Sequence, residues 1–258
     1  MMLRRLAATA LISSAVATFE LPSNGAHAGT FEVKAPEITK GESELLTNHA
    51  SQGGFSNSAD QVRHSFELLA AYAPTDYFKP AIKLGFDRPV GETAHLGTVG
   101  IEGQFYLGKL SPGISIGWFT ALDMRAHSDE TNTLVFGPLI KFGDDALSLT
   151  VNPFLERTFG PNREEGLTLT YAIGLKAAVR EGLALGIEAY GAIPEIADPP
   201  ESHLHEHRIG PVIFIDHDVT SALQSARPTK LSLEIGAFVG LSDAAPDWTG
   251  KIKAALTW

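Results

Sequence analysis

The sequence has 258 residues, a formal net charge of −10 and no cysteine. An acidic chain is a poor partner for nucleic acid and for an anionic membrane surface, since both attract basic proteins. Without cysteine, neither a disulfide scaffold nor a thiolate metal site can form. One domain is expected, because all-β chains of this length are routinely single domains.

The first 28 residues have the features of a secretory signal peptide. Arg4 and Arg5 form a basic region, and residues 6–19 form an apolar run that is too short to cross a bilayer as a helix. Ala26-His27-Ala28 then matches the small-x-small pattern that signal peptidase reads. The pattern predicts cleavage after Ala28 and an exported mature chain.

From residue 61 onwards, apolar residues recur at every second position, which is the period of a β-strand rather than of a helix. In residues 62–72 (VRHSFELLAAY) the even positions are mostly apolar and the odd positions are polar or small. The same alternation returns along the rest of the chain, and a weaker first strand precedes it, which gives twelve predicted strands: 41–50, 62–72, 78–87, 99–107, 114–125, 134–142, 147–156, 167–176, 183–190, 209–215, 231–241 and 252–258.

The connections between these segments alternate in length. Tight turns are expected at 73–76, 108–113, 143–146 and 179–182, and longer polar loops at 50–60, 127–132, 158–166, 194–207 and 242–249. Short turns on one side and long loops on the other are typical of up-and-down barrels of the outer membrane, with both termini periplasmic. Two connections fit less well: 216–229 is long where a turn is expected, and 88–92 is short where a loop is expected.

A soluble β-sandwich also alternates, so the polar register decides between the two classes. If that register faces inward, nine basic and nine acidic side chains line the interior: Arg63, Lys79, Lys83, Arg125, Lys141, Lys176, Arg208, Lys251 and Lys253, with Glu42, Glu44, Glu67, Asp87, Glu102, Asp123, Glu156, Glu188 and Glu234. The apolar register carries charge only near strand ends, at Arg88 and Arg157. A mid-strand charge facing lipid would cost roughly 2–4 kcal/mol, so this pattern favours a membrane barrel.

Aromatic residues on the apolar register gather near strand ends, as in the belts at bilayer interfaces. They are Tyr72, Phe78, Phe86, Phe142, Trp248 and Trp258. The sequence thus predicts a twelve-stranded antiparallel β-barrel over residues 41–258 in the outer membrane, with residues 29–40 as a periplasmic N-terminal extension.

The C-terminus, Leu256-Thr257-Trp258, resembles that of bacterial outer-membrane proteins, whose last strand ends on an aromatic residue. Lys253 stands where such strands often have glycine. The resemblance implies outer-membrane lipid as surroundings and the barrel-assembly machinery as a partner that reads the strand ending in Trp258. The segments 208–212 (RIGPV) and 240–247 (GLSDAAPD) look like those of uncharacterised proteobacterial barrels described as outer-membrane transporters of the meta-pathway phenol-degradation type. That resemblance implies transport without naming a solute.

The expected function is a passive channel or transporter for a small solute, without a cofactor. Eight strands make a filled barrel and sixteen to eighteen leave an aqueous channel, and twelve lie between these cases. The pore-lining candidates are Glu67, Lys83, Glu102, Gln104, Asp123, Arg125, Lys141, Asn152, Glu156, Lys176, Glu188, Tyr190 and Glu234. A non-conducting structural or adhesive barrel, acting through its extracellular loops, is the alternative.

Motifs of an enzyme or a metal site are sparse. The chain has no phosphate-binding glycine motif, no Gly-x-Ser-x-Gly elbow and no zinc-hydrolase pattern. His64 and Ser65 are adjacent, so they face opposite sides of a strand and cannot form a hydrolase pair. His203, His205 and His207 share one face if extended, as metal ligands would, but a solvated loop explains them more simply. The sequence therefore predicts a protein that is not an enzyme.

The turn at residues 73–76 predicts the register of the hairpin that it closes. If pairing is centred on Thr75, opposed residues have numbers that sum to 150. Glu67 would then lie directly across from Lys83, and Arg63 from Asp87, which gives two opposite-charge pairs on the inner face.

Overall fold

The computed structural model describes residues 31–258 except 56–57, 89–92, 127–130, 162, 164, 224 and 226. Its twelve strands are β1 Ser43–Phe55, β2 Ser58–Tyr72, β3 Phe78–Arg88, β4 His95–Ser111, β5 Ile114–Arg125, β6 Asn132–Gly143, β7 Leu147–Phe159, β8 Thr168–Arg180, β9 Leu183–Ile193, β10 Glu206–Asp218, β11 Lys230–Gly240 and β12 Trp248–Thr257. A single turn of 3-10 helix, η2 (Ser202–Leu204), precedes β10. Among the described residues, no helix is long and apolar enough to span a membrane. The predicted signal peptide, residues 1–28, lies outside the described part of the chain.

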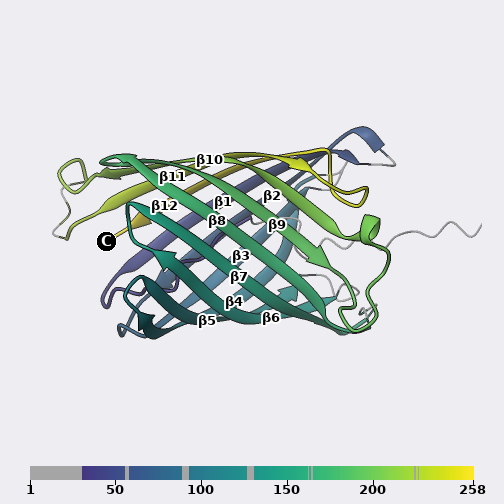
Figure 1. Cartoon of the computed structure of the whole chain (residues 1–258), viewed down its shortest axis with the longest axis horizontal. Helices are drawn as coiled ribbons and strands as arrows, with labels where there is room; N and C mark the ends of the chain where they lie inside the picture. Colours follow the sequence, from purple (N-terminus) through teal and green to yellow (C-terminus); the bar gives the residue numbers. More distant parts are fainter. Residues whose placement is uncertain are drawn as a thin grey trace, which may run out of the picture.

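The twelve strands form one closed antiparallel barrel, as predicted, in which every strand pairs with its neighbours in sequence and β1 also pairs with β12 (Figure 1). The closing pair runs from Glu44 opposite Thr257 to Gly53 opposite Trp248. Main-chain hydrogen bonds between Ser43 and Trp258, of 2.9 and 3.1 Å, complete it. Closure leaves no strand edge unpaired, which a sheet in lipid requires.

The first strand is longer than its faint alternation indicates, since β1 extends to Phe55 and the predicted segment ended at residue 50. Its inward positions include Leu46 and Ala50 beside the polar Asn48 and Gln52, all of them buried. Apolar and polar residues therefore occur on one face, and the period-two signal weakens although the strand is fully paired on both sides.

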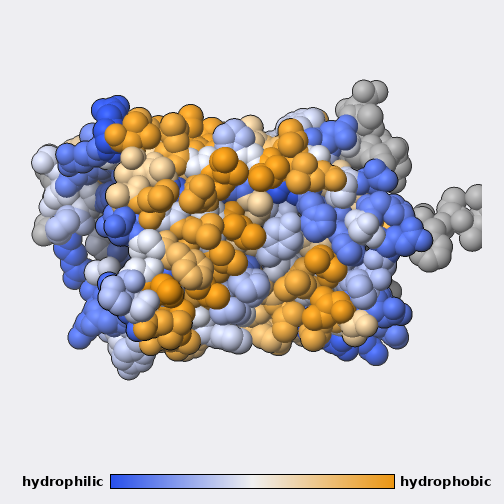
Figure 2. All heavy atoms as spheres, in the orientation of Figure 1, coloured by the Kyte–Doolittle hydropathy of each residue, from blue (hydrophilic) through white to orange (hydrophobic). Residues whose placement is uncertain are grey.

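The outer wall is apolar, and the inner wall carries the buried charges beside small apolar clusters, an arrangement unlike that of a soluble sandwich. Ile82 and Ile101, paired across β3 and β4, are 62% and 53% exposed, whereas Glu67 and Lys83 on the other face are 4% and 8% exposed. Orange, hydrophobic residues cover the middle of the barrel, and blue, hydrophilic residues gather at both ends (Figure 2). Tyr72, Phe142, Trp248 and Trp258 are exposed on the outside, as expected of interface aromatics.

The predicted register of the β2–β3 hairpin is wrong by two residues. Glu67 lies opposite Gly85, and Lys83 lies opposite Leu69. The turn differs from the expected one, because a bridge between Thr75 and Phe78 leaves residues 76–77 at its tip and the ladder is centred on Asp76 rather than on Thr75. A shift of two keeps every side chain on its face, so the Lys83 ammonium still reaches Glu67, at 3.7 Å along the diagonal. The second predicted pair is replaced, since the Asp87 carboxylate contacts Arg125, at 3.1 Å.

The segment before β1 lies inside the barrel, which differs from the expected extension in the periplasm. This segment is attached at the end of the barrel that carries the short turn 73–76, where the Gly41 N–H donates to the Ala73 carbonyl, at 2.7 Å. Residues 31–37 then run along the lumen, and we call them the strap. The strap lies in the lumen because its contacts satisfy charged and amide side chains on the inner wall.

Candidate functional site: the lumen and its strap

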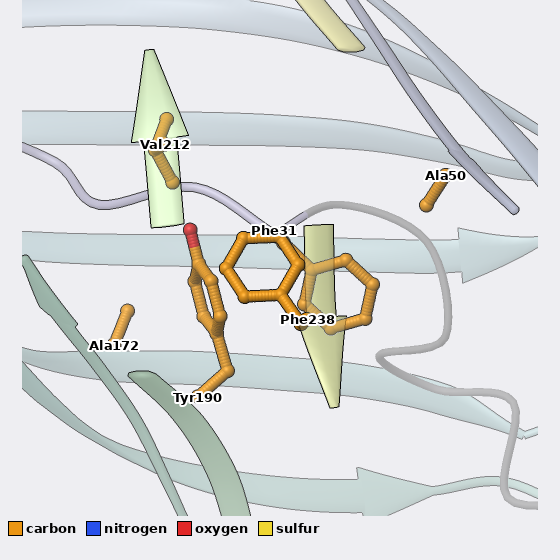
Figure 3. Packing of buried hydrophobic residues seen from close by; sticks show 6 residues of the cluster. All are labelled: Phe31, Ala50, Ala172, Tyr190, Val212 and Phe238. Carbon is orange, nitrogen blue, oxygen red and sulfur yellow. The ribbon is translucent and has the colours of Figure 1, made fainter. Parts of the chain in front are cut away.

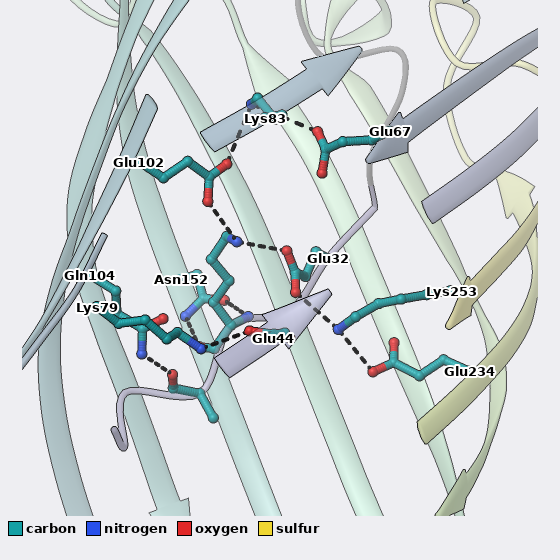
Figure 4. A network of polar contacts seen from close by, with 12 residues as sticks. Glu32, Glu44, Glu67, Lys79, Lys83, Glu102, Gln104, Asn152, Glu234 and Lys253 are labelled. Atoms are coloured by element: carbon teal, nitrogen blue, oxygen red, sulfur yellow. Dashed lines mark hydrogen bonds and ion pairs between the residues drawn. The ribbon is translucent and has the colours of Figure 1, made fainter. Parts of the chain in front are cut away.

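Two wall amides hold the main chain of the strap (Figure 4). The Asn152 side chain on β7 accepts the Lys34 N–H, at 2.7 Å, and donates to the Lys34 carbonyl, at 2.9 Å. Gln104 on β4 donates to the carbonyls of Ala35, at 2.9 Å, and Pro36, at 3.3 Å. Asn152 is completely buried and Gln104 nearly so, and a buried amide without such partners would be destabilising.

The charges of the strap pair with opposite charges on the wall. Glu32 lies 2.9 Å from the Lys253 ammonium on β12, and the Lys34 ammonium lies 3.2 Å from Glu102 on β4. Within the strap, Glu32 and Lys34 are 2.6 Å apart. The strap therefore links opposite sides of the barrel through alternating charges, as the dashed contacts in Figure 4 show.

Phe31 occupies an aromatic pocket at the end of the strap (Figure 3). Its ring centroid lies 5.1 Å from that of Tyr190 and 6.4 Å from that of Phe238, and the Arg208 guanidinium lies 4.6 Å from the ring. Ala50, Ala172 and Val212 complete the pocket. A buried ring beneath a guanidinium combines apolar burial with a cation–π contact, so this residue is the main apolar anchor of the strap.

A glycine on the wall makes room for the strap. A Cβ atom added at Gly174 on β8 would lie 3.1 Å from a methyl group of Val33. A larger residue there would push the strap away from the wall, so this strand glycine permits the close approach of another chain segment.

The strap separates two cavities in the lumen. A cavity of about 720 Å³ extends toward the short turns and reaches the turn residues 181–182, and one of about 130 Å³ lies on the other side, beside Tyr171 and Glu206. Glu32 and Lys34 line both cavities. The strap is thus the partition between the two spaces.

Two lysines bind carboxylates within the wall itself. The Lys83 ammonium lies 2.9 Å from Asp123, 3.4 Å from Glu102 and 3.7 Å from Glu67. The Lys251 side chain is fully buried, with Glu188 at 2.9 Å and Glu234 at 3.0 Å. Loss of either lysine would be destabilising, because it would leave buried carboxylates without a compensating charge.

The structure brings most of the pore-lining candidates into this arrangement. Gln104, Asn152, Glu102 and Lys141 contact the strap, the last through Glu37 at 3.4 Å. Glu67, Lys83 and Asp123 form one wall network, and Glu188, Tyr190 and Glu234 form another around Lys251. The remaining three lie apart from these groups: Arg125 pairs with Asp87, Lys176 stacks on Phe214 at 4.6 Å, and Glu156 is buried on β7.

Sequence reasoning missed the strap, although a signal was present. Phe31, Val33 and Ala35 alternate with Glu32 and Lys34, which is the same period-two pattern as in the strands. The pattern was too short to be separated from an ordinary extension. Its wall partners, Lys253, Glu102 and Asn152, are distant in sequence and come together only through closure of the barrel.

The three histidines proposed as metal ligands turn to different partners. The His203 imidazole lies 3.4 Å from Glu201, His205 lies 3.0 Å from the Pro200 carbonyl, and His207 lies 2.8 Å from the Tyr171 hydroxyl. In the described part of the chain, no group of three or more His, Cys, Asp or Glu side chains could hold a metal ion. The arrangement does not bring the three imidazoles together as ligands.

A serine–histidine contact that sequence reasoning did not consider lies on the outer wall. The Ser51 hydroxyl on β1 lies 3.0 Å from His64 on β2 and 3.1 Å from His49. Strand pairing places Ser51 opposite His64, a neighbour on another strand that alternation within one strand does not reveal. Among the contacts of the described residues, no carboxylate orients either imidazole, so the third member of a hydrolase triad is missing.

The barrel architecture is similar to those of solved outer-membrane channels and porins. The COG4313 outer membrane channel from Pseudomonas putida F1 superposes with a TM-score of 0.65 at 11% identity, over 88% of this chain and 100% of that chain. The NanC porin gives 0.54 at 6% identity, and the KdgM porin in complex with disordered oligogalacturonate gives 0.51 at 12%; each match covers 83% of this chain and 98% of the other. At these identities the likeness shows the fold.

No family model and no curated protein matches the sequence.

Proposed function

We propose that the chain is a passive channel of the bacterial outer membrane for small polar solutes, narrowed by its own strap. The observation that carries this proposal is the composition of the lumen. Among the described residues, the strap is the segment that divides the lumen; it is held by hydrogen bonds and ion pairs, with cavities of about 720 and 130 Å³ on its two sides. A small barrel whose wall side chains fill the interior has no such removable part.

A free end would let the strap leave the lumen without threading. Cleavage after Ala28 remains a prediction, and it would make Gly29 the first residue, two positions before Phe31. The strap would then be the N-terminal end of the mature protein. Withdrawal would require only the loss of its contacts with the wall.

The partners follow from the outer surface. The apolar band of Figure 2 fits outer-membrane lipid, and the last strand, which ends at Trp258, fits recognition by the barrel-assembly machinery. Membership of the meta-pathway phenol-degradation type of transporter remains a proposal that rests on residues 208–212 and 240–247. It names no solute for this chain.

Single-channel recording in planar bilayers tests the proposal. We expect the mature protein to give small discrete steps, and a variant with residues 31–37 replaced by a Gly-Ser sequence of equal length to give steps severalfold larger. The reason is that the replacement keeps the chain length but removes the amide, charge and aromatic contacts. The folded state of both proteins is checked by heat-modifiable migration in gels.

The same recordings distinguish the second candidate function, a non-conducting structural or adhesive barrel. That candidate is favoured by the strap, which fills the centre of the lumen between the two cavities. Silence of the strap-replaced variant over a wide voltage range would support it and refute the channel. Deletion of residues 196–204, none of which lines either cavity, should leave the conductance steps intact.

A further inference from the structure

The wall site that holds the strap recognises a main chain, and we propose that it binds short extended peptides when the strap is absent from it. The proposal rests on the channel function proposed above and gives that channel a solute class. In this interpretation the strap is a resident pseudo-ligand, and its contacts describe what a competing solute must supply.

The main-chain contacts do not depend on the side chains that the strap carries. Asn152 satisfies both the N–H and the carbonyl of one residue, Lys34, as a neighbouring β-strand would. Gln104 donates to two successive carbonyls, those of Ala35 and Pro36. In peptide recognition by strand addition, such main-chain bonds supply affinity and side-chain pockets supply specificity.

The side-chain subsites occur in a fixed order along this main chain. The aromatic pocket of Tyr190 and Phe238, beneath Arg208, holds the first residue. The Lys253 ammonium then takes a carboxylate, and Glu102 takes an ammonium group two residues later. A peptide with an apolar N-terminal residue and charged side chains can occupy all three subsites in an extended conformation.

The site also lies on the route through the barrel. Glu32 and Lys34 line both cavities. A ligand in their place would therefore be reached through the larger cavity on the side of the short turns and would border the smaller cavity. A peptide bound there would obstruct ion flow in a barrel that lacks the strap. Block of current is therefore the direct readout of binding.

The test uses the full-length variant with residues 31–37 replaced by Gly-Ser. A synthetic heptapeptide with the sequence of residues 31–37, FEVKAPE, is added to the side of the short turns. We expect reversible, concentration-dependent block. A heptapeptide that keeps the phenylalanine and has alanine elsewhere should also block, because Asn152 and Gln104 contact only the main chain.

Two controls remove the main-chain contacts. FEVKAPE methylated on the backbone nitrogen of its lysine cannot donate to Asn152, and it should bind roughly tenfold more weakly, the loss expected for one hydrogen bond. Asn152→Ala in the strap-replaced protein should weaken block by unmodified FEVKAPE by at least as much.

Three outcomes would overturn the proposal. The first is no block by FEVKAPE in a conducting variant, and the second is equal block by the methylated peptide. The third is block by FEVKAPE but not by the alanine-substituted heptapeptide, which would show that the site accepts only the sequence of the strap. A strap-replaced variant that does not conduct would instead refute the channel function.

Discussion

Replacing Lys251 by methionine should lower the free energy of unfolding of the barrel by about 3–5 kcal/mol, the cost of breaking a buried ion pair. The Lys251 side chain is fully buried on β12, and its ammonium lies 2.9 Å from Glu188 and 3.0 Å from Glu234. Without it, Glu188 is left as an uncompensated carboxylate, while Glu234 keeps Lys253, at 3.0 Å. Urea unfolding in lipid vesicles, followed by tryptophan fluorescence, measures the change.

A matched control is Lys230→Met at the rim of the same barrel. Lys230 lies 3.8 Å from Asp216 in an exposed pair, which contributes only about 0–1 kcal/mol. The double variant Lys251→Met with Glu188→Gln should recover part of the loss, since no unpaired charge then remains on Glu188. Equal destabilisation by the Lys230 and Lys251 variants would show that the buried network does not stabilise the wall.

Replacing Phe31 by alanine should increase the fraction of time that the strap spends outside the lumen by roughly a hundredfold or more. Truncation of a buried phenylalanine costs about 3–5 kcal/mol, and each 1.4 kcal/mol is a factor of ten. The loss falls on strap binding rather than on the fold, because the strands pair without the strap. The probability of the larger conductance level in bilayer recordings measures it.

The control for this variant is Phe142→Ala, which truncates a phenylalanine that is exposed on the outer wall. Its conductance levels should match those of the unmodified protein. If Phe31→Ala also left the occupancy of the levels unchanged, the aromatic pocket would not be the anchor of the strap.

The fold could be predicted because a membrane barrel imposes one local rule on every strand. Alternation such as that of residues 62–72 fixes which face meets lipid, and even the two-residue register error kept Glu67 and Lys83 inside. The error arose at the turn, where the strand period does not determine whether the tip is Thr75 or the pair 76–77.

The site was predicted only in part. Its wall consists of strand residues, which the alternation places, whereas the strap at its centre is not part of a strand. Candidates such as Asn152 and Glu102 were placed inside by their register. Their partner, Lys34, comes from a segment with no strand neighbour, and the contact joins residues separated by 118 positions in the case of Asn152. No local pattern carries that information, and the same holds for Ser51 and His64 across two strands.

The central claim, that the strap lies in the lumen and limits the current, is tested most directly by a reversible cross-link. The chain has no cysteine of its own, so the pair Val33→Cys and Gly174→Cys introduces the only two thiols. The Cβ of Val33 lies 3.4 Å from the position of a Cβ at residue 174, which is close to the separation that a disulfide needs.

In a single bilayer recording of this pair in the Phe31→Ala background, the oxidised protein should stay at the small conductance level, and addition of reductant should restore the visits to the larger level that Phe31→Ala allows. Each single-cysteine variant should be insensitive to reductant. Failure of the pair to cross-link, or a conductance that does not change on reduction, would contradict the account.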